Sequence, residues 1–146
     1  MSLFDVFNVS GSALNAETIR LNTTASNLAN AESVNGDPSQ VYRARHPVFR
    51  AMLAHAETGF DAGSDESQAA TGVRVLGIVQ STTPPLKSYQ PDHPLADKDG
   101  FVYSSNVNTI EEMTNMISAS RSYQSNLEVI NTAKELLLRT LSLGQA

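Results

Sequence analysis

Apolar side chains recur every seven residues at the beginning of the chain. The members of this repeat are Phe7, Leu14, Leu21 and Leu28. Three residues before each of them stand Phe4, Gly11, Thr18 and Ala25. Residues three, four and seven apart share one face of an α-helix, so the pattern predicts a helix from Leu3 to about Ala31 with one packing stripe. The small residues of the second set would let a neighbouring helix approach closely.

A second heptad repeat occupies the last part of the chain. It predicts a helix from about Asn108 to about Leu143, and Asn108 with Glu111 fits a capping box at its start. We expect the two terminal helices to pair as an antiparallel coiled coil. The members of the repeat are Met116, Tyr123, Ile130 and Leu137, with Met113, Leu127 and Leu141 at companion positions and Ser120 and Lys134 as interruptions.

The remaining surface of the N-terminal helix is polar but almost uncharged. Residues 1–36 contain four charged side chains, Asp5, Glu17, Arg20 and Glu32, whereas Asn, Ser and Thr are abundant. Solvated helix faces normally carry more charge, and Asn, Ser and Thr each cost up to about 0.7 kcal/mol relative to Ala inside a helix. We therefore expect partners to order this helix and to contact its polar face as well as its stripe.

The region between the helices is rich in turn residues and β-formers. The run Asn35-Gly36-Asp37-Pro38 ends the first helix, and residues 41–53 form an extended piece that Pro47 interrupts. Short strands are favoured at residues 73–81, 86–89 and 101–103, so we expect a β element of two to four strands.

The chain therefore divides into three parts, and its fold class is mainly α with a small β element. An N-terminal helix occupies residues 1–35, a β-rich middle region residues 36–105 and a C-terminal helix residues 106–146. Within the middle region, residues 57–71 are expected to form a mobile acidic loop.

Composition disfavours several classes of function. Aromatic residues make up 6% of the chain and tryptophan is absent, which argues against a large enclosed active site. The chain has no cysteine, which excludes disulfides and thiol catalysis. Its net charge is −5, and four of the negative charges come from Glu57, Asp61, Asp65 and Glu66. No basic cluster suggests nucleic-acid binding, and no apolar run has the length of a signal or membrane segment.

The residues that could carry chemistry do not form a known pattern. The three histidines and the aspartates near the third could hold zinc or act as acid and base, but their spacing fits no ligand motif. Asp97-Lys98-Asp99-Gly100 resembles part of a calcium loop and is better explained as a tight turn before Phe101. We predict no metal, no cofactor and no enzymatic activity. The residues considered are His46, His55, His93, Asp92, Asp97 and Asp99.

Both ends of the chain resemble the signatures of bacterial flagellar rod and hook proteins. The first signature reads Gly11-Ser12-Ala13-Leu14-Asn15-Ala16, Arg20-Leu21-Asn22 and Ala25-Ser26-Asn27-Leu28-Ala29-Asn30-Ala31. The second begins Asn106-Val107-Asn108-Thr109-Ile110-Glu111-Glu112-Met113, continues through residues 118–124 and ends near Gln145. The short length and the run of residues 93–102 resemble the proximal rod members of the family. The acidic stretch around residues 61–68 is longer than that resemblance accounts for.

The resemblance implies a structural subunit of the rod, the drive shaft that crosses the periplasm and transmits motor torque to the hook and filament. It implies export by the flagellar type III apparatus without a cleaved signal peptide. The implied partners are other copies of the chain, the rod proteins FlgB, FlgF and FlgG, and the junction with FliE and the MS ring, with no nucleic acid and no direct membrane insertion. The two heptad stripes would then be the assembly interface, with the β element on the outside.

Two other functions remain open on the residues alone. A coiled-coil adaptor that binds one partner helix would share the heptad repeats but would not need both terminal signatures. A small hydrolase that uses His46 or His93 would need a substrate or metal site that the spacing does not provide.

Overall fold

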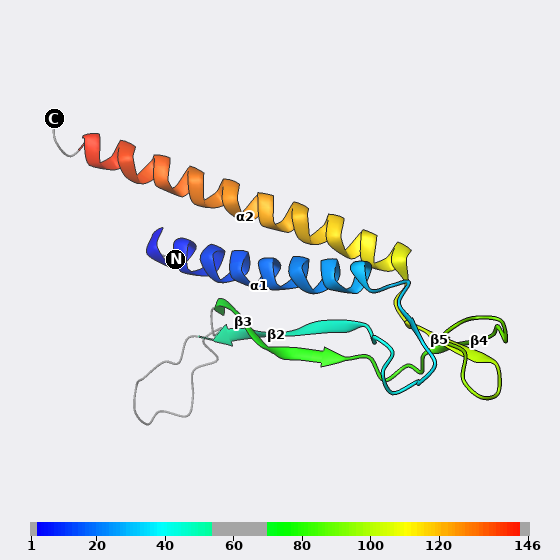
Figure 1. The fold of residues 1–146 in the computed structure, drawn as a ribbon. Coiled ribbons are helices and arrows are strands. Elements are labelled where there is room, and N and C mark those ends of the chain that lie inside the picture. Colours follow the sequence, from blue (N-terminus) through cyan, green and yellow to red (C-terminus); the bar gives the residue numbers. More distant parts are fainter. Residues whose placement is uncertain (1–2, 54–69, 144–146) are drawn as a thin grey trace, which may run out of the picture.

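Two long helices flank five short strands in the chain. The computed structural model describes residues 3–53 and 70–143 (Figure 1). The elements in order are α1 (Leu3–Ala29), β1 (Val34–Asn35), β2 (Arg45–Leu53), β3 (Ala70–Gln80), β4 (Leu86–Tyr89), β5 (Phe101–Ser104) and α2 (Thr109–Leu143). The fold is thus mainly α with a small β element, as the sequence predicted. Helix α1 ends two residues before the predicted limit, and α2 lies within a residue of its predicted bounds.

The elements stack in three layers. Helix α1 lies between α2 on one side and the β2–β3 pair on the other (Figure 1). The two helices run in opposite directions, and α2 extends beyond the N-terminal end of α1. With 35 residues against 27, α2 is longer by eight residues, or roughly 12 Å at ~1.5 Å per residue.

The strands form two separate antiparallel sheets. One sheet has the order β1-β5-β4 and lies where α1 ends and α2 begins. The other pairs β2 with β3, from Arg45 opposite Gln80 to Leu53 opposite Ala70, with register shifts after Val48 and after Met52.

Three sequence expectations about the strands were wrong. The described chain has five strands, not two to four, because Val34 and Asn35 form a short pairing with β5. Pro47 does not interrupt β2 but lies opposite Ile78, which a two-stranded sheet tolerates because one edge of each strand has no partner strand. Ala70 and Thr71, expected in the acidic loop, belong to β3. The rest of that expected loop falls outside the described residues.

The interior of the chain is small and unusually polar. Its buried apolar residues are Ala16, Val41, Ala44, Val102, Ala119 and Ala133. Its buried polar residues are Ser10, Thr23, Thr24, Asn27, Ser105 and Glu112. Among the side chains that the structure describes, no Leu, Ile, Met or Phe is buried. Large apolar side chains contribute most to a folding core, so a single chain leaves much of its hydrophobic surface in water.

Helix α2 begins at the predicted cap. The side-chain oxygen of Asn108 accepts hydrogen bonds from the amides of Ile110 and Glu111, at 3.1 and 3.3 Å. These bonds satisfy two amides that have no partner within the helix, which typically stabilises a helix start by about 1 kcal/mol.

Candidate assembly site

The heptad repeat of α1 divides into two environments. Its members are all partly buried between the neighbouring layers, and the companions three residues earlier are all exposed. The companions therefore share a different face of α1, one that neither α2 nor the β2–β3 sheet covers. The partly buried members are Phe7, Leu14, Leu21 and Leu28, and the exposed companions are Phe4, Gly11, Thr18 and Ala25.

The repeat of α2 divides in the same way. Met116, Tyr123, Ile130 and Leu137 are partly buried. The companions Met113, Leu127 and Leu141 remain 52%, 43% and 58% exposed. Small or polar residues three or four positions away, which the sequence analysis did not single out, lie in the seam instead; they are Glu112, Ala119, Asn126 and Ala133. The short side chains of Ala119 and Ala133 leave room for two helices to approach closely.

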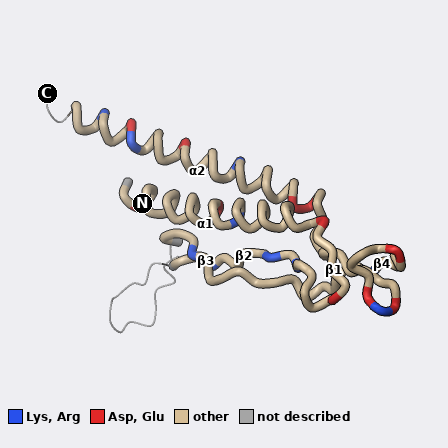
Figure 2. Tube along the Cα trace, viewed as in Figure 1, with Lys and Arg blue, Asp and Glu red and all other residues tan. Residues whose placement is uncertain are grey.

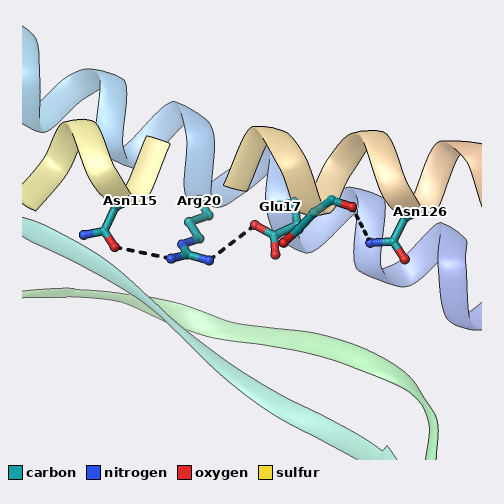
Figure 3. A network of polar contacts seen from close by, with 5 residues as sticks. Glu17, Arg20, Asn115 and Asn126 are labelled. Carbon is teal, nitrogen blue, oxygen red and sulfur yellow. Dashed lines mark hydrogen bonds and ion pairs between the residues drawn. The ribbon is translucent and has the colours of Figure 1, made fainter. Parts of the chain in front are cut away.

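One polar layer crosses the seam between the helices (Figure 3). A guanidinium nitrogen of Arg20 donates to Oδ1 of Asn115 across the seam at 3.3 Å. The other terminal nitrogen lies 3.7 Å from Oε2 of Glu17, one turn away on α1. That oxygen is buried and accepts no hydrogen bond from the described part of the chain. With side chains 28% and 19% exposed, the ion pair is expected to contribute less than about 1 kcal/mol.

A buried asparagine ties the last turns of α1 to the start of β2. Asn27 is fully buried, and its side-chain oxygen accepts from the Arg45 amide and the Tyr42 hydroxyl, both at 2.9 Å. Its side-chain nitrogen donates to the Arg45 carbonyl at 2.8 Å. The amide group thus engages both backbone groups of Arg45, as a neighbouring strand would.

A second asparagine ties the segment before α2 to the same place. Asn106 accepts from the Ala44 amide at 2.8 Å and donates to the Thr83 carbonyl at 2.7 Å. The adjacent amides of Ala44 and Arg45 are therefore both bound by asparagines. Asn27 comes from the N-terminal helix, and Asn106 comes from the segment that leads into the C-terminal helix. We call the group of Asn27, Ala44, Arg45 and Asn106 the asparagine junction.

The asparagine junction was not predicted from the sequence, although Asn27 and Asn106 both stand inside the terminal signatures. A helix-disfavouring Asn in an uncharged helix did signal that a partner was needed. For Asn27 the partner lies within the chain. Spacing could not show this, because Asn27 and Arg45 belong to different elements.

A third polar contact holds the far end of the β2–β3 sheet against α1. The hydroxyl of Ser12 accepts from the Val73 amide at 3.0 Å and donates to the Val9 carbonyl at 2.7 Å. Gly72 has a φ of 149°, and a Cβ there would lie 2.5 Å from the Ser12 hydroxyl. The close approach of sheet and helix thus requires glycine at this position.

The predicted chemical candidates lie apart from one another. His46 is exposed on β2, whereas His93 lies in a turn, where Nδ1 accepts from the Leu95 amide at 3.1 Å. His55 lies outside the described residues. In the ranges 3–53 and 70–143, no three His, Cys, Asp or Glu side chains gather as a metal site would require.

The segment that resembled part of a calcium loop is a turn, as predicted. One oxygen of Asp97 accepts from the amides of Asp99 and Phe101, at 2.9 and 2.8 Å. The Phe101 bond is the largest influence that lowers the pKa of Asp97; the Asp99 amide, the Tyr103 hydroxyl and the charge of Lys87 also lower it, against some desolvation. The carboxylate serves to close the turn that leads into β5.

Charge is distributed sparsely over the helices. Figure 2 shows long uncharged stretches along α1 and α2, and on β2 and β3 it shows basic but no acidic residues. Within the described ranges, neither helix is long and apolar enough to cross a membrane.

Comparisons with known proteins agree on one family. The model of the family described as "Flagella basal body rod protein" matches residues 7–36, and that described as "Flagellar basal body rod FlgEFG protein C-terminal" matches residues 98–143. The chain is 48% identical over 145 residues to the flagellar basal-body rod protein FlgC of Yersinia enterocolitica and 46% identical to that of Salmonella typhimurium. Each alignment covers 99% of this chain and 100% of the relative. A FlgC of Buchnera aphidicola is 39% identical over 148 residues.

Proposed function

We propose that the chain joins its neighbours through both terminal helices. The premise is that the chain belongs to the flagellar basal-body rod family and to its FlgC members. The chain is a structural subunit of the rod, and the family is a structural one, not a family of enzymes. The proposal concerns the surfaces, partners and route by which the subunit takes its place.

The observation that carries this proposal is the apolar surface of α2. Large apolar side chains along the whole helix are between 43% and 78% exposed. Exposed apolar surface of this extent normally marks a protein interface. The residues are Ile110, Met113, Ile117, Leu127, Val129, Leu136, Leu138, Leu141 and Leu143.

Within the subunit, we propose that the partly buried heptad residues pack as an antiparallel coiled coil. Phe7, Leu14, Leu21 and Leu28 of α1 would face Met116, Tyr123, Ile130 and Leu137 of α2. The exposed companions Met113, Leu127 and Leu141 would then contact neighbouring subunits. Rod assembly thus uses both sides of α2, one within the chain and one between chains.

The partners follow from membership of the rod. We propose that neighbouring positions are held by further copies of the chain, by FlgB, FlgF and FlgG, and by the junction with FliE and the MS ring at the base. We also propose that the chain reaches this place through the flagellar type III apparatus without a cleaved signal peptide. Torque would pass through many small apolar contacts between helices, as the heptad surfaces allow.

A charge on the exposed side of α2 tests the assembly surface. Leu127→Asp should leave the free subunit folded because Leu127 is 43% exposed, yet it should reduce the yield of intact basal bodies at least ten-fold, since burying an unpaired carboxylate is costly. Gln124→Asp, at an exposed position of the same helix, is the matched control and should assemble better. Basal-body yield and swimming in a strain that lacks the native subunit are the readouts. Normal assembly of Leu127→Asp would contradict the proposed surface.

A further inference from the structure

An open and largely apolar crevice lies between the start of α1 and the second half of α2. Val6 of α1 and residues 125–136 of α2 line a hollow of about 390 Å³. Leu136 at its edge is 50% exposed, and Leu138, Leu141 and Leu143 follow on the part of α2 that extends past α1. The lining is Val6, Ser125, Glu128, Val129, Thr132, Ala133 and Leu136. This crevice is continuous with the seam between α1 and α2.

The lining restricts what can enter the crevice. Four of its seven lining residues are apolar and none is basic, so a carboxylate placed there would lose hydration without a partner. Its edge carries two hydroxyls, Ser125 and Thr132, and one carboxylate, Glu128. A fitting occupant therefore has no carboxylates, presents hydrogen-bond donors, and has side chains short enough for a helix to come close.

The outer face of α1 meets these requirements. All the exposed residues of α1 from position 6 to its end are uncharged, and none is larger than Asn. Three of them are asparagines, whose amide nitrogens can donate to hydroxyls and to Glu128. By contrast, the exposed faces of α2 include charged residues such as Arg121, Lys134 and Glu135. The residues of this outer face are Asn8, Gly11, Asn15, Thr18, Asn22, Ala25 and Ala29.

Within the residues that the structure describes, no contact explains a glycine at position 11. A Cβ built at Gly11 meets nothing within 4 Å, so alanine would fit there. Glycine inside a helix is among the least favourable residues, so its presence lowers the stability of α1. No contact of the described residues compensates for this loss. A second helix packed closely over this position supplies the missing reason.

We propose that the crevice of one subunit receives the outer face of α1, centred on Gly11, from a second copy of the chain. This inference rests on the proposed function and specifies which faces meet. Two different surfaces of the same chain meet in this contact, so it joins subunits head to tail and can continue as an open helical array.

Cysteine cross-linking tests the contact directly, because the chain has no cysteine of its own. Thr132→Cys is combined in turn with Asn15→Cys, Thr18→Cys or Asn22→Cys, and basal bodies are isolated and oxidised. We expect at least one pair to give disulfide-linked dimers and longer multimers, and the single variants to give no such ladder. A bond within one chain is excluded, because Val6 and Thr132 line the same crevice and Asn15, the nearest of the three positions, lies nine residues, or roughly 14 Å, further along α1.

The cross-linking outcomes separate this inference from the proposed function. Isolated basal bodies that contain the chain but give no ladder with any pair would overturn the inference alone. Cross-links from Thr132→Cys only to another rod protein would overturn it as well. Failure of the unmodified chain to enter basal bodies would overturn the proposed function.

Gly11→Ala gives a second test with opposite effects on the subunit and the rod. It should raise the melting temperature of the free chain by about 2–4 °C, since alanine favours the helix. It should lower basal-body yield at least ten-fold, because a methyl group now separates the two helices. Gly77→Ala on β3 is the matched control, since a Cβ there also meets nothing within 4 Å, and it should leave assembly unchanged. Normal assembly of Gly11→Ala, or an equal loss from both variants, would overturn the inference.

Discussion

The two ends of the helix pair are built in opposite ways. At the end where α1 stops and α2 begins, the buried side chains are mostly polar, and the asparagine junction pairs them with backbone groups of the same chain. At the other end, around Val6 and Leu136, the side chains are mostly apolar and open to water.

This difference indicates what each end can do before assembly. Hydrogen bonds within the chain can hold together the end where α1 stops and α2 begins, even in a single subunit. We call this end the base of the helix pair. Apolar surface left in water gains most when another molecule covers it. We therefore expect mutations at the base to affect folding, and mutations at the free ends to affect assembly.

The largest effect on folding is expected at Asn27. Asn27→Leu is similar in size but leaves the Arg45 amide and the Arg45 carbonyl without their partner, while the Tyr42 hydroxyl keeps only its hydrogen bond with Ser26. At about 1–3 kcal/mol for each unsatisfied buried group, the free energy of unfolding should fall by about 3 kcal/mol or more. Urea denaturation followed by circular dichroism measures this. Asn22→Leu, on the exposed face of α1, is the control. A loss below about 1 kcal/mol for Asn27→Leu would show that the asparagine junction does not stabilise the fold.

A smaller effect is expected at Asn106. Asn106→Ala removes the bonds to the Ala44 amide and the Thr83 carbonyl, but Asn106 is only partly buried, so water can replace part of the loss. We expect the free energy of unfolding to fall by about 1–2 kcal/mol. Hydrogen exchange of the Ala44 amide should accelerate in this variant. Unchanged protection of the Ala44 amide would show that Asn106 does not hold the base of the helix pair together.

The smallest effect on folding is expected at Leu141, on the end of α2. Leu141→Gln should change the free energy of unfolding by less than about 0.5 kcal/mol, because the side chain is already 58% exposed. Swimming should nevertheless decline, as a polar side chain weakens the apolar contact. A stability loss above about 1 kcal/mol would mean that the free end is already packed in the single subunit, and the contrast between the ends would fail.

The heptad repeats predicted both helices, and the cap at Asn108 predicted the start of α2, but the predicted end of α1 was two residues too late. They were not sufficient to tell the buried face of each helix from the exposed one, because residues three positions and four positions from a heptad member flank the same stripe on opposite sides. On α1 the set with Gly11 is exposed, and on α2 the one set that contains Ala119 and Ala133 occupies the seam in place of Met113 and Leu127. Small side chains give little hydrophobic signal even where they are fully buried.

The polar contacts between elements could not be predicted from spacing. Asn27 meets Arg45, Ser12 meets Val73, and neither pair belongs to one periodic element. Pro47 shows a related difficulty, since its place in β2 depends on the sheet having only two strands. The sequence did indicate that α1 is too polar to be stable as an isolated helix. The structure shows that the β2–β3 sheet covers part of α1.

The β2–β3 sheet is fastened to α1 at two places, Ser12 and Asn27, which lie 15 residues or roughly 22 Å apart along the helix. In mechanical terms, a beam that is attached to a second beam at two separated points resists bending far better than the first beam alone. The sheet acts as a splint for a helix made of weak helix formers. A subunit under repeated twisting load would then strain at the unsplinted end, which is where its neighbours are proposed to grip.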